Sequence, residues 1–362
     1  MRIIIKIGTN SLLDNKGALD EAALGRYVAQ IVTLKKSGHQ VALVSSGAVS
    51  AGRALWQQSG GKTKFKDPVL GNQILASLGQ ARLIDSYNHA LAPHGMAAAQ
   101  LLMTRYDFRH RRHCVNIARL MEALLRQGHV LPVINENDSL ALEELVFTDN
   151  DELAGLIAAH TGADRMIVLT NVDGVYDPAC LPDRKVIPEI SGTGRDWPAI
   201  DQSKSTGGRG GMAAKISAAR KLARAGVETI IANAATPDIL PKIMANAPIG
   251  TKIRAAARPS GLKRWLGAEA TAPRGSITVN AGLEDRLITG KTTPSLLPVG
   301  ISSLSGDFEK GDIVAILSES GKHIGFGQAR YDARTLATRC GVQNQPVFIH
   351  ADALVIAERS NI

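Results

Sequence analysis

The sequence predicts an α/β protein: an open, mainly parallel sheet sandwiched by helices, followed by a small, mostly-β barrel. Along residues 1–255, short runs of Ile, Val and Leu alternate with helical patterns, and strands that alternate with helices form parallel sheets. Beyond residue 273, β-like runs separated by glycine turns replace these patterns. A chain of 362 residues is also long for one core and suits two domains.

The individual elements follow from the period of the apolar residues. Strands are expected at residues 2–7, 41–44, 97–103, 130–134, 165–169 and 227–232. Helices are expected after the Ser-Ser-Gly turn at 45–47 and at residues 20–36, 69–90, 113–127, 151–161 and 212–225. In the second domain, β-like runs are expected at residues 277–279, 313–317, 323–326 and 347–349. These patterns predict domains over residues 1–255 and 274–352, joined by a linker rich in Ala, Pro, Gly and Arg over 256–273.

Composition argues against several classes of protein. The three cysteines lie far apart without CxxC spacing, which argues against a disulfide framework or zinc site and predicts a cytoplasmic protein. Lys6 interrupts the opening apolar run, so we expect no signal peptide, and no apolar stretch is long enough to span a bilayer. Residues 256–362 hold 12 Lys and Arg against 10 Asp and Glu, so we expect no nucleic-acid partner.

Polar residues stand where two predicted strands end, and open parallel sheets bind ligands beyond such ends. Lys6 stands near the end of the first strand, shortly before Gly8, so a backbone can approach a phosphate while the ammonium group reaches it. A lysine that merely extends into solvent has the same pattern. The second strand ends in residues 45–47, where free N–H groups at a helix start form an anion site. An ordinary serine N-cap is the alternative there.

Acidic and amide residues follow two further strands. One cluster spans residues 135–138 and a second spans residues 148–152, at the start of a helix. Such clusters can bind an ammonium group and organise cations, although Asp149 or Asn150 could also be a plain helix cap. The strand at 165–169 leads into residues 170–176, a turn that could contact a nucleotide or be a type I turn stabilised by Asn and Asp.

A glycine-rich loop precedes the last helix of the first domain. Four glycines lie within residues 205–211, and Lys215 follows within the first turns of the helix. The loop can wrap polyphosphate with backbone N–H groups while Lys215 reaches the transferring phosphoryl group. No Gly-Lys-Ser/Thr follows, so this is not a Walker A motif, and the GxGxxA spacing at 208–213 lacks the preceding strand of a dinucleotide site. Together, the strand-end residues are the parts that phosphoryl transfer needs, and they predict an ATP-dependent small-molecule kinase.

Nearly the whole chain resembles the amino-acid kinase family. The segments that carry the resemblance are KIGTN at 6–10, VSSGAVSAG at 44–52, GQARL at 79–83, PVINENDSL at 132–140, TDNDELAGLIA at 148–158, TNVDGVY at 170–176 and GGRGGMAAKISAA at 207–219. PVINEND followed by TDND is typical of the members that act on glutamate. The C-terminal part resembles a PUA domain, through SLLPVGI at 295–301 and GDFEKGDIVAI at 306–316.

The resemblance implies phosphorylation of the side-chain carboxylate of L-glutamate by ATP, with Mg²⁺, to L-glutamyl 5-phosphate, the first step of proline biosynthesis. By matching position, Lys6 and Lys215 would neutralise charge on the transferring phosphoryl group, and Asp151 would hold these lysines. The residues that would bind glutamate are Ser46, Asp138 and Asn150, with support from Asp149. The residues that would contact ATP are Lys6, Thr170, Asn171, Arg209, Gly210, Gly211, Met212, Ala213, Ala214 and Lys215. The resemblance implies no metal ligand in the chain itself.

Two residues depart from the family pattern, and both concern the nucleotide. Asn171 stands where many members carry Asp, and Arg209 stands where Thr is common. The implied partners are L-glutamate, ATP, further copies of the chain in a homo-oligomer, and glutamyl-phosphate reductase as a channelling partner, with no membrane. The alternatives are a sister kinase that acts on another carboxylate and an RNA-binding protein that acts through the PUA-like domain.

Overall fold

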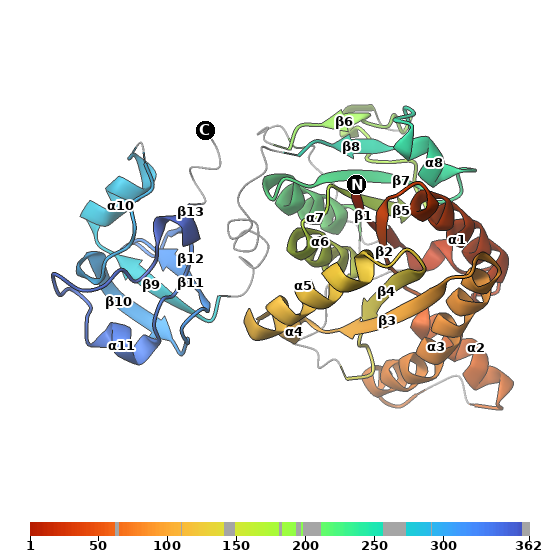
Figure 1. Ribbon diagram of the computed structural model, residues 1–362, viewed down its shortest axis with the longest axis horizontal. Helices are drawn as coiled ribbons and strands as arrows, with labels where there is room; N and C mark the ends of the chain where they lie inside the picture. The colour runs from red at the N-terminus through yellow and green to blue at the C-terminus, as the bar shows by residue number, and fades with distance from the viewer. Residues whose placement is uncertain are drawn as a thin grey trace.

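The structure is a computed structural model that describes residues 1–61, 65–109, 111–140, 149–180, 183–192, 197, 211–255, 273–290 and 292–356. Its strands form two separate sheets (Figure 1). The first sheet is built from strands between residues 2 and 253, and the second from strands between residues 275 and 356. The α/β fold followed by a mostly-β part is therefore confirmed.

The larger sheet has the strand order β3-β4-β2-β1-β5-β7-β8-β6 within the described part of the chain. Its strands are β1 (Arg2–Ile7), β2 (Gln40–Val44), β3 (Ala97–Met103), β4 (Val130–Glu136), β5 (Arg165–Thr170), β6 (Glu189–Ile190), β7 (Glu228–Asn233) and β8 (Thr251–Ile253). From β3 to β7 every neighbouring pair is parallel, so the carboxyl ends of these strands share one edge. β8 runs antiparallel to β7 and pairs in parallel with β6.

Two helical layers cover the faces of the larger sheet (Figure 1). Side chains of a strand alternate between the faces, so Ile4 of β1 enters one core while Ile3 and Ile5 enter the other. The helices that pack on the Ile4 side are α4 (Arg105–Arg109), α5 (Arg111–Leu125), α6 (Asn150–Thr161) and α7 (Met212–Arg224). The helices that pack on the opposite side are α1 (Glu21–Lys36), α3 (Pro68–Leu91) and α8 (Ile239–Met244), and α2 (Ala48–Gln58) packs along α3.

The second sheet is smaller and mixed, with the order β10-β9-β11-β12-β13 among the described residues. Its elements are β9 (Gly275–Val279), α10 (Ala281–Ile288), β10 (Ile301–Gly306), β11 (Ile313–Leu317), β12 (His323–Gln328), α11 (Ala333–Ala337) and β13 (Leu354–Ile356). The apolar core of this sheet shares no residue with the two cores of the larger sheet. Residues 256–272 of the expected linker lie outside the described residues.

Most expected elements lie within a few residues of the observed ones, and the strands at 97–103 and 313–317 have the same bounds. The strand expected at 347–349 is wrong, because only Ile349 pairs there, in an isolated bridge with Leu296. Phe348 and Ile349 are fully buried, so this apolar run reflects burial of a loop and not a strand. No helix in the described ranges combines the length and apolar character that a membrane crossing requires.

Candidate active site

Four charged side chains meet at the carboxyl edge of the larger sheet. Lys6 Nζ lies 2.8 Å from Asp151 Oδ1, and Lys215 Nζ lies 2.8 Å from Asp151 Oδ2. The oxygens of Asp149 stand further off, 3.6 Å from Lys6 Nζ and 3.8 Å from Lys215 Nζ. We call these four residues the charge cluster. One carboxylate thus bridges two ammonium groups, which is the arrangement implied for Asp151.

The positions of these residues in the secondary structure explain why they meet. Lys6 is the second-last residue of β1, while Asp151 and Lys215 stand in the first turns of α6 and α7. β1 and these two helices therefore converge at the carboxyl edge of the sheet. Acidic residues are favourable at a helix start, whereas Lys215 is not, so its position depends on the paired carboxylate.

Burial and charge act in opposite directions on the charge cluster. Burial acts to raise the pKa of Asp151, but the nearby Lys6 and Lys215 outweigh it and hold this pKa below the ordinary value. Burial acts to lower the pKa of Lys6, but Asp151 and Asp149 outweigh it, so this pKa is raised. Burial and the charge of Asp151 raise the pKa of Asp149 to about 6, against the attraction of Lys6. Asp149 is thus the member whose charge changes near neutral pH.

Burial of the charge cluster costs free energy, so its presence indicates a function. Lys6, Asp151 and Lys215 are 3 %, 0 % and 7 % exposed, and taking an ion out of water costs several kcal/mol even where pairing offsets part of it. Buried groups with displaced pKa values are characteristic of active sites. The two lysine ammonium groups are held in fixed positions by Asp151, which suits stabilisation of a phosphoryl group that carries negative charge.

A cavity of about 350 Å³ opens beside the charge cluster, and we call it the acceptor cavity. Its lining is mostly small or polar, and comprises Thr9, Ser46, Gly47, Ala48, Val49, Ser50, Asn72, Asn135, Glu136, Asp138, Asp149 and Asn150. Helix α2 begins at this cavity after Gly47, whose φ of 104° is one that glycine adopts without strain. The positive end of α2 therefore lies at the cavity, which suits an anion.

The amide of Asn150 is tightly held in the wall of the acceptor cavity. Its Nδ2 donates to Ser45 O at 3.0 Å, Ser46 Oγ at 2.8 Å and Asn135 Oδ1 at 3.1 Å. Its Oδ1 is closed off from solvent and has no hydrogen-bond partner among the residues that the structure describes. A buried acceptor without a partner costs about 1–3 kcal/mol, so Asn150 Oδ1 keeps unused capacity to accept a hydrogen bond beside the cavity that Asn150 lines.

The residues expected to contact ATP lie on the other side of Lys6, toward β5 and β7. Thr170 ends β5 and, with Asn171 and Asn233, lines a cavity of about 720 Å³. Gly211 is the N-cap of α7, and the first three residues of that helix are Met212, Ala213 and Ala214. Arg209 and Gly210 lie outside the described residues. Of the glycine-rich loop, the structure therefore describes only Gly211, which leads into the helix that carries Lys215.

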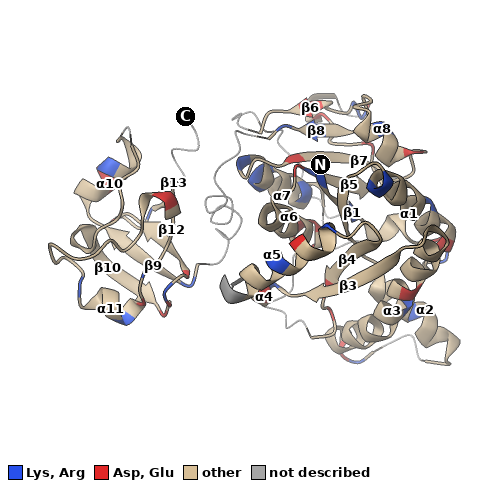
Figure 2. Ribbon diagram, in the orientation of Figure 1, with Lys and Arg blue, Asp and Glu red and all other residues tan. Residues whose placement is uncertain are grey.

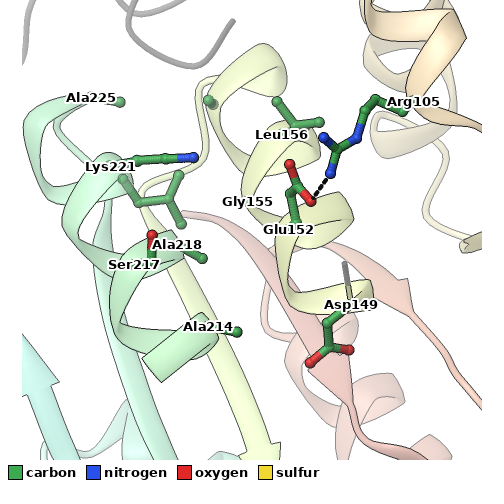
Figure 3. Close-up of a pocket in the computed structure, with 12 residues that line it drawn as sticks. Arg105, Asp149, Glu152, Gly155, Leu156, Ala214, Ser217, Ala218, Lys221 and Ala225 are labelled. Atoms are coloured by element: carbon green, nitrogen blue, oxygen red, sulfur yellow. Dashed lines mark hydrogen bonds and ion pairs between the residues drawn. The ribbon is translucent and has the colours of Figure 1, made fainter. Parts of the chain in front are cut away.

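A third cavity, of about 300 Å³, lies between α6 and α7, and Figure 3 shows its lining. Small apolar residues form most of it, while Arg105 and Glu152 make an ion pair of 2.5 Å at its rim and Lys221 extends over it. Asp149 lines both this cavity and the acceptor cavity. Its mostly apolar walls contrast with the polar lining of the acceptor cavity, which is the better place for a carboxylate substrate.

Comparisons with known proteins agree with this geometry. Residues 1–233 match the amino acid kinase family, and residues 275–344 match the PUA domain. The chain belongs to the amino-acid kinase family. The match includes every residue of the charge cluster and of the acceptor cavity lining, so the candidate active site lies within the part shared with the family.

Curated relatives align with nearly the whole chain. Glutamate 5-kinase of Chlorobaculum tepidum is 43% identical over 356 residues, covering 98% of this chain and 97% of that protein. Glutamate 5-kinase of Bacteroides thetaiotaomicron is 37% identical over 360 residues, covering 98% of each. Among solved structures, UMP kinase of Bacillus anthracis has a TM-score of 0.46 and 16% identity, covering 71% of this chain and 96% of that chain. That structural likeness is too low to support an argument.

The structure gathers residues that the family resemblance named separately. Ser46, Asp138, Asp149 and Asn150 all line the acceptor cavity, as expected of residues that bind one small substrate. Sequence reasoning did not single out Asn135, although it belongs to the quoted segment PVINENDSL. It also missed the contact between Asn135 and the segment GQARL at 79–83, because nothing in either segment alone indicates that they meet.

Proposed function

We propose that this protein is an ATP-dependent kinase that phosphorylates the side-chain carboxylate of L-glutamate and so begins proline biosynthesis. The observation that carries this proposal is Asp151, whose two oxygens hold Lys6 and Lys215 at 2.8 Å beside a small polar cavity. Two relatives that align with 98% of this chain are named glutamate 5-kinase.

The reaction needs positioning and charge neutralisation more than proton transfer. A carboxylate oxygen of glutamate attacks the γ-phosphorus of ATP, the bond from that phosphorus to the β–γ bridging oxygen breaks, and ADP leaves with the electron pair. Because a carboxylate is already ionised at pH 7, no general base is required. Lys6 and Lys215 neutralise the charge on the phosphoryl oxygens during transfer, and Asp151 keeps both lysines in place.

The acceptor cavity offers partners for two of the three charged groups of glutamate, one carboxylate and the ammonium group. The start of α2 at Ser46 and Gly47 suits a carboxylate, and the oxygens of Asp138 and Asn150 suit the ammonium group. Asp149 lines the cavity and also faces Lys6, so it would connect the bound substrate with the charge cluster. Glutamate would therefore bind with its side-chain carboxylate directed toward the lysines.

ATP and Mg²⁺ belong to the opposite side of the charge cluster. Thr170, Asn171 and the start of α7 from Gly211 to Lys215 are the described residues that would contact ATP. No group of three or more His, Cys, Asp or Glu side chains is gathered for a metal in the described ranges. The nearby carboxylates Asp149 and Asp151 already face lysines, so the phosphate oxygens of ATP would hold Mg²⁺, which neutralises part of their charge.

An assay of ADP release across a panel of acidic amino acids tests the proposed function. L-Glutamate should stimulate ATP turnover far more than L-aspartate or N-acetylglutamate. The side chain of aspartate is one methylene shorter, so its carboxylate would not reach the lysines, and the acetyl group of N-acetylglutamate removes the ammonium charge. Equal or higher activity with aspartate would instead assign the protein to a sister kinase. The low net charge of the C-terminal region does not favour the RNA-binding alternative, and the ribbon of the PUA-like domain carries both acidic and basic positions in Figure 2.

We also propose that the kinase activity resides in residues 1–255, followed by the linker 256–273 and the PUA-like domain 274–352. The separate cores of the two sheets support this division. A chain that ends at Ala255 should keep substantial glutamate-dependent ATP turnover. A truncated chain that is folded by circular dichroism yet inactive would contradict the division.

Three further parts of the proposal concern the setting of the enzyme. Cys114, Cys180 and Cys340 form no disulfide with one another, which suits the reducing cytoplasm. The enzyme would act as a homo-oligomer. Glutamyl-phosphate reductase is the proposed channelling partner, because an acyl phosphate reacts readily with water and benefits from direct transfer to the next enzyme.

A further inference from the structure

Gln80 of α3 lies behind the wall of the acceptor cavity and contacts a residue of that wall. It is not among the residues that line the cavity, but its Oε1 accepts a hydrogen bond of 2.9 Å from Asn135 Nδ2. Asn135 is only 2 % exposed, so water is not available to replace that acceptor. Gln80 therefore satisfies a buried donor at the end of β4.

This contact helps to fix which end of each amide faces which neighbour. Asn135 Oδ1 accepts from the backbone N–H of Glu136 at 2.9 Å and from Asn150 Nδ2 at 3.1 Å, while its Nδ2 donates to Gln80. A reversed Asn135 amide would set donor against donor at Asn150 and acceptor against acceptor at Gln80. The chain of contacts thus keeps Asn150 Nδ2 directed inward and leaves Asn150 Oδ1 as an acceptor without a partner in the described part of the chain.

A close approach of α2 and α3 brings Gln80 to this position. A Cβ on Gly79 would lie 1.8 Å from Ala48 O, and a Cβ on Gly52 would lie 1.8 Å from Leu75 O, so neither position can carry a side chain without moving the helices apart. This packing holds α3 against the start of α2 and places Gln80 beside the end of β4. It gives a physical reason for the glycine–glutamine pair at residues 79–80.

We propose that Gln80 is a positioning residue for recognition of the substrate's ammonium group. This role rests on the proposed function and deepens it. Through Asn135, Gln80 holds the amide of Asn150 so that Oδ1 is the acceptor left on the cavity side. An ammonium group carries hydrogen-bond donors only, so it can satisfy this acceptor. The relay Gln80–Asn135–Asn150 thereby favours an amino acid over the same dicarboxylate without its amine.

Steady-state kinetics of the full chain test this role, with glutarate as a competitive inhibitor that lacks the ammonium group. Gln80→Met removes the acceptor and keeps the length of the side chain. It should raise KM for glutamate roughly three- to tenfold, as expected for one lost hydrogen bond, and leave kcat and KM for ATP within about twofold. The Ki of glutarate should stay within about twofold. Gln80→Glu keeps an acceptor oxygen and should restore KM for glutamate to within about twofold of the wild type.

Several results would overturn this role of Gln80. These are a wild-type KM in Gln80→Met, a Ki of glutarate that rises as much as KM for glutamate, or a Gln80→Glu variant as impaired as Gln80→Met. If Gln80→Met does not fold, Gln80→Ala must show the same split between KM and Ki. If the wild-type protein does not turn over glutamate, both the proposed function and this role of Gln80 are wrong. If it does, but the Gln80 variants change KM for glutamate and Ki of glutarate equally, only the role of Gln80 is wrong.

Discussion

The charge cluster and the wall of the acceptor cavity share one edge of the sheet, yet they are held together differently. In the cluster, full charges are paired in a buried place, with Asp151 2.8 Å from each of two lysines. In the wall, neutral amides and hydroxyls hold Asn150 through hydrogen bonds of 2.8 Å to 3.1 Å. Charges act on the barrier to phosphoryl transfer, whereas neutral hydrogen bonds fix the shape and polarity of a binding site.

The contrast predicts that substitutions in the two regions change different kinetic constants. A buried lysine that neutralises charge only during transfer should affect kcat, and a cavity residue that contacts bound substrate should affect KM for glutamate.

Removal of either lysine should have the largest effect. Lys215→Ala and Lys6→Ala should each lower kcat by on the order of 10² or more, because each removes a preorganised charge from the transition state. ADP release at saturating glutamate and ATP measures this effect. Lys221→Ala is the matched control, since Lys221 lies on the same helix but outside the charge cluster, and it should keep a kcat within about twofold. A near-normal kcat for Lys215→Ala would contradict its assigned role.

Replacement of Asp151 by Asn should lower kcat by on the order of 10² as well, through loss of alignment of the lysines. It should also destabilise the fold by about 3–5 kcal/mol, because it leaves two buried ammonium groups without their close carboxylate. Urea unfolding measured beside the kinetics separates the two effects. A variant with normal kcat would show that Asp151 serves stability alone.

Replacement of Asp138 in the acceptor cavity should mainly change substrate affinity. Asp138→Ala should raise KM for glutamate roughly tenfold, as expected for one lost charge-assisted hydrogen bond, with kcat within about threefold. Initial rates across a range of glutamate concentrations give both constants. If kcat falls as much as in the lysine variants while KM is unchanged, the cavity and the charge cluster act as one unit.

Asp149 belongs to both regions, and its pH dependence gives the smallest effect. Its pKa is raised from 3.8 to about 6 in the folded chain, so folding favours the protonated form. The contribution of this group to the free energy of unfolding therefore falls as pH rises from about 4 to 6 and is constant above that window. Asp149→Asn removes the titration, so the variant should gain about 1–3 kcal/mol over the wild type across this window.

Urea unfolding of both proteins between about pH 4.5 and pH 7.5 measures this difference. The free energy of unfolding of Asp149→Asn minus that of the wild type should grow as pH rises. If it is constant or becomes smaller, the pKa of Asp149 is not raised. The same variant should bind glutamate less well, so stability and substrate affinity would change in opposite directions.

Sequence reasoning succeeded where the signal is local. The parallel strands could be predicted because runs such as residues 2–7 are apolar and short. The positions of Lys6 at the end of a strand, and of Asp151 and Lys215 in the first turns of helices, could also be predicted from the local pattern. Family resemblance then named Asp151 as the residue between the two lysines, and the structure places it there.

Features that depend on contacts between distant segments were not predictable in this way. Gln80 and Asn135 are 55 residues apart in the chain, and they meet only because Gly52 and Gly79 let two helices approach closely. Residues 347–349 have the composition of a strand but lack a strand to pair with, so only one bridge forms. The polarity of the Asn150 amide likewise depends on three neighbours from other segments.

The most direct test of the account is to trap the acyl phosphate that it requires. L-Glutamyl 5-phosphate reacts with hydroxylamine to form a hydroxamate, which gives a colour with iron(III). The wild-type protein should form this hydroxamate only with both ATP and L-glutamate, in proportion to ADP released, and Lys215→Ala should form almost none. ADP release without hydroxamate, or equal hydroxamate formation with L-aspartate, would contradict phosphorylation of the glutamate side chain at this site.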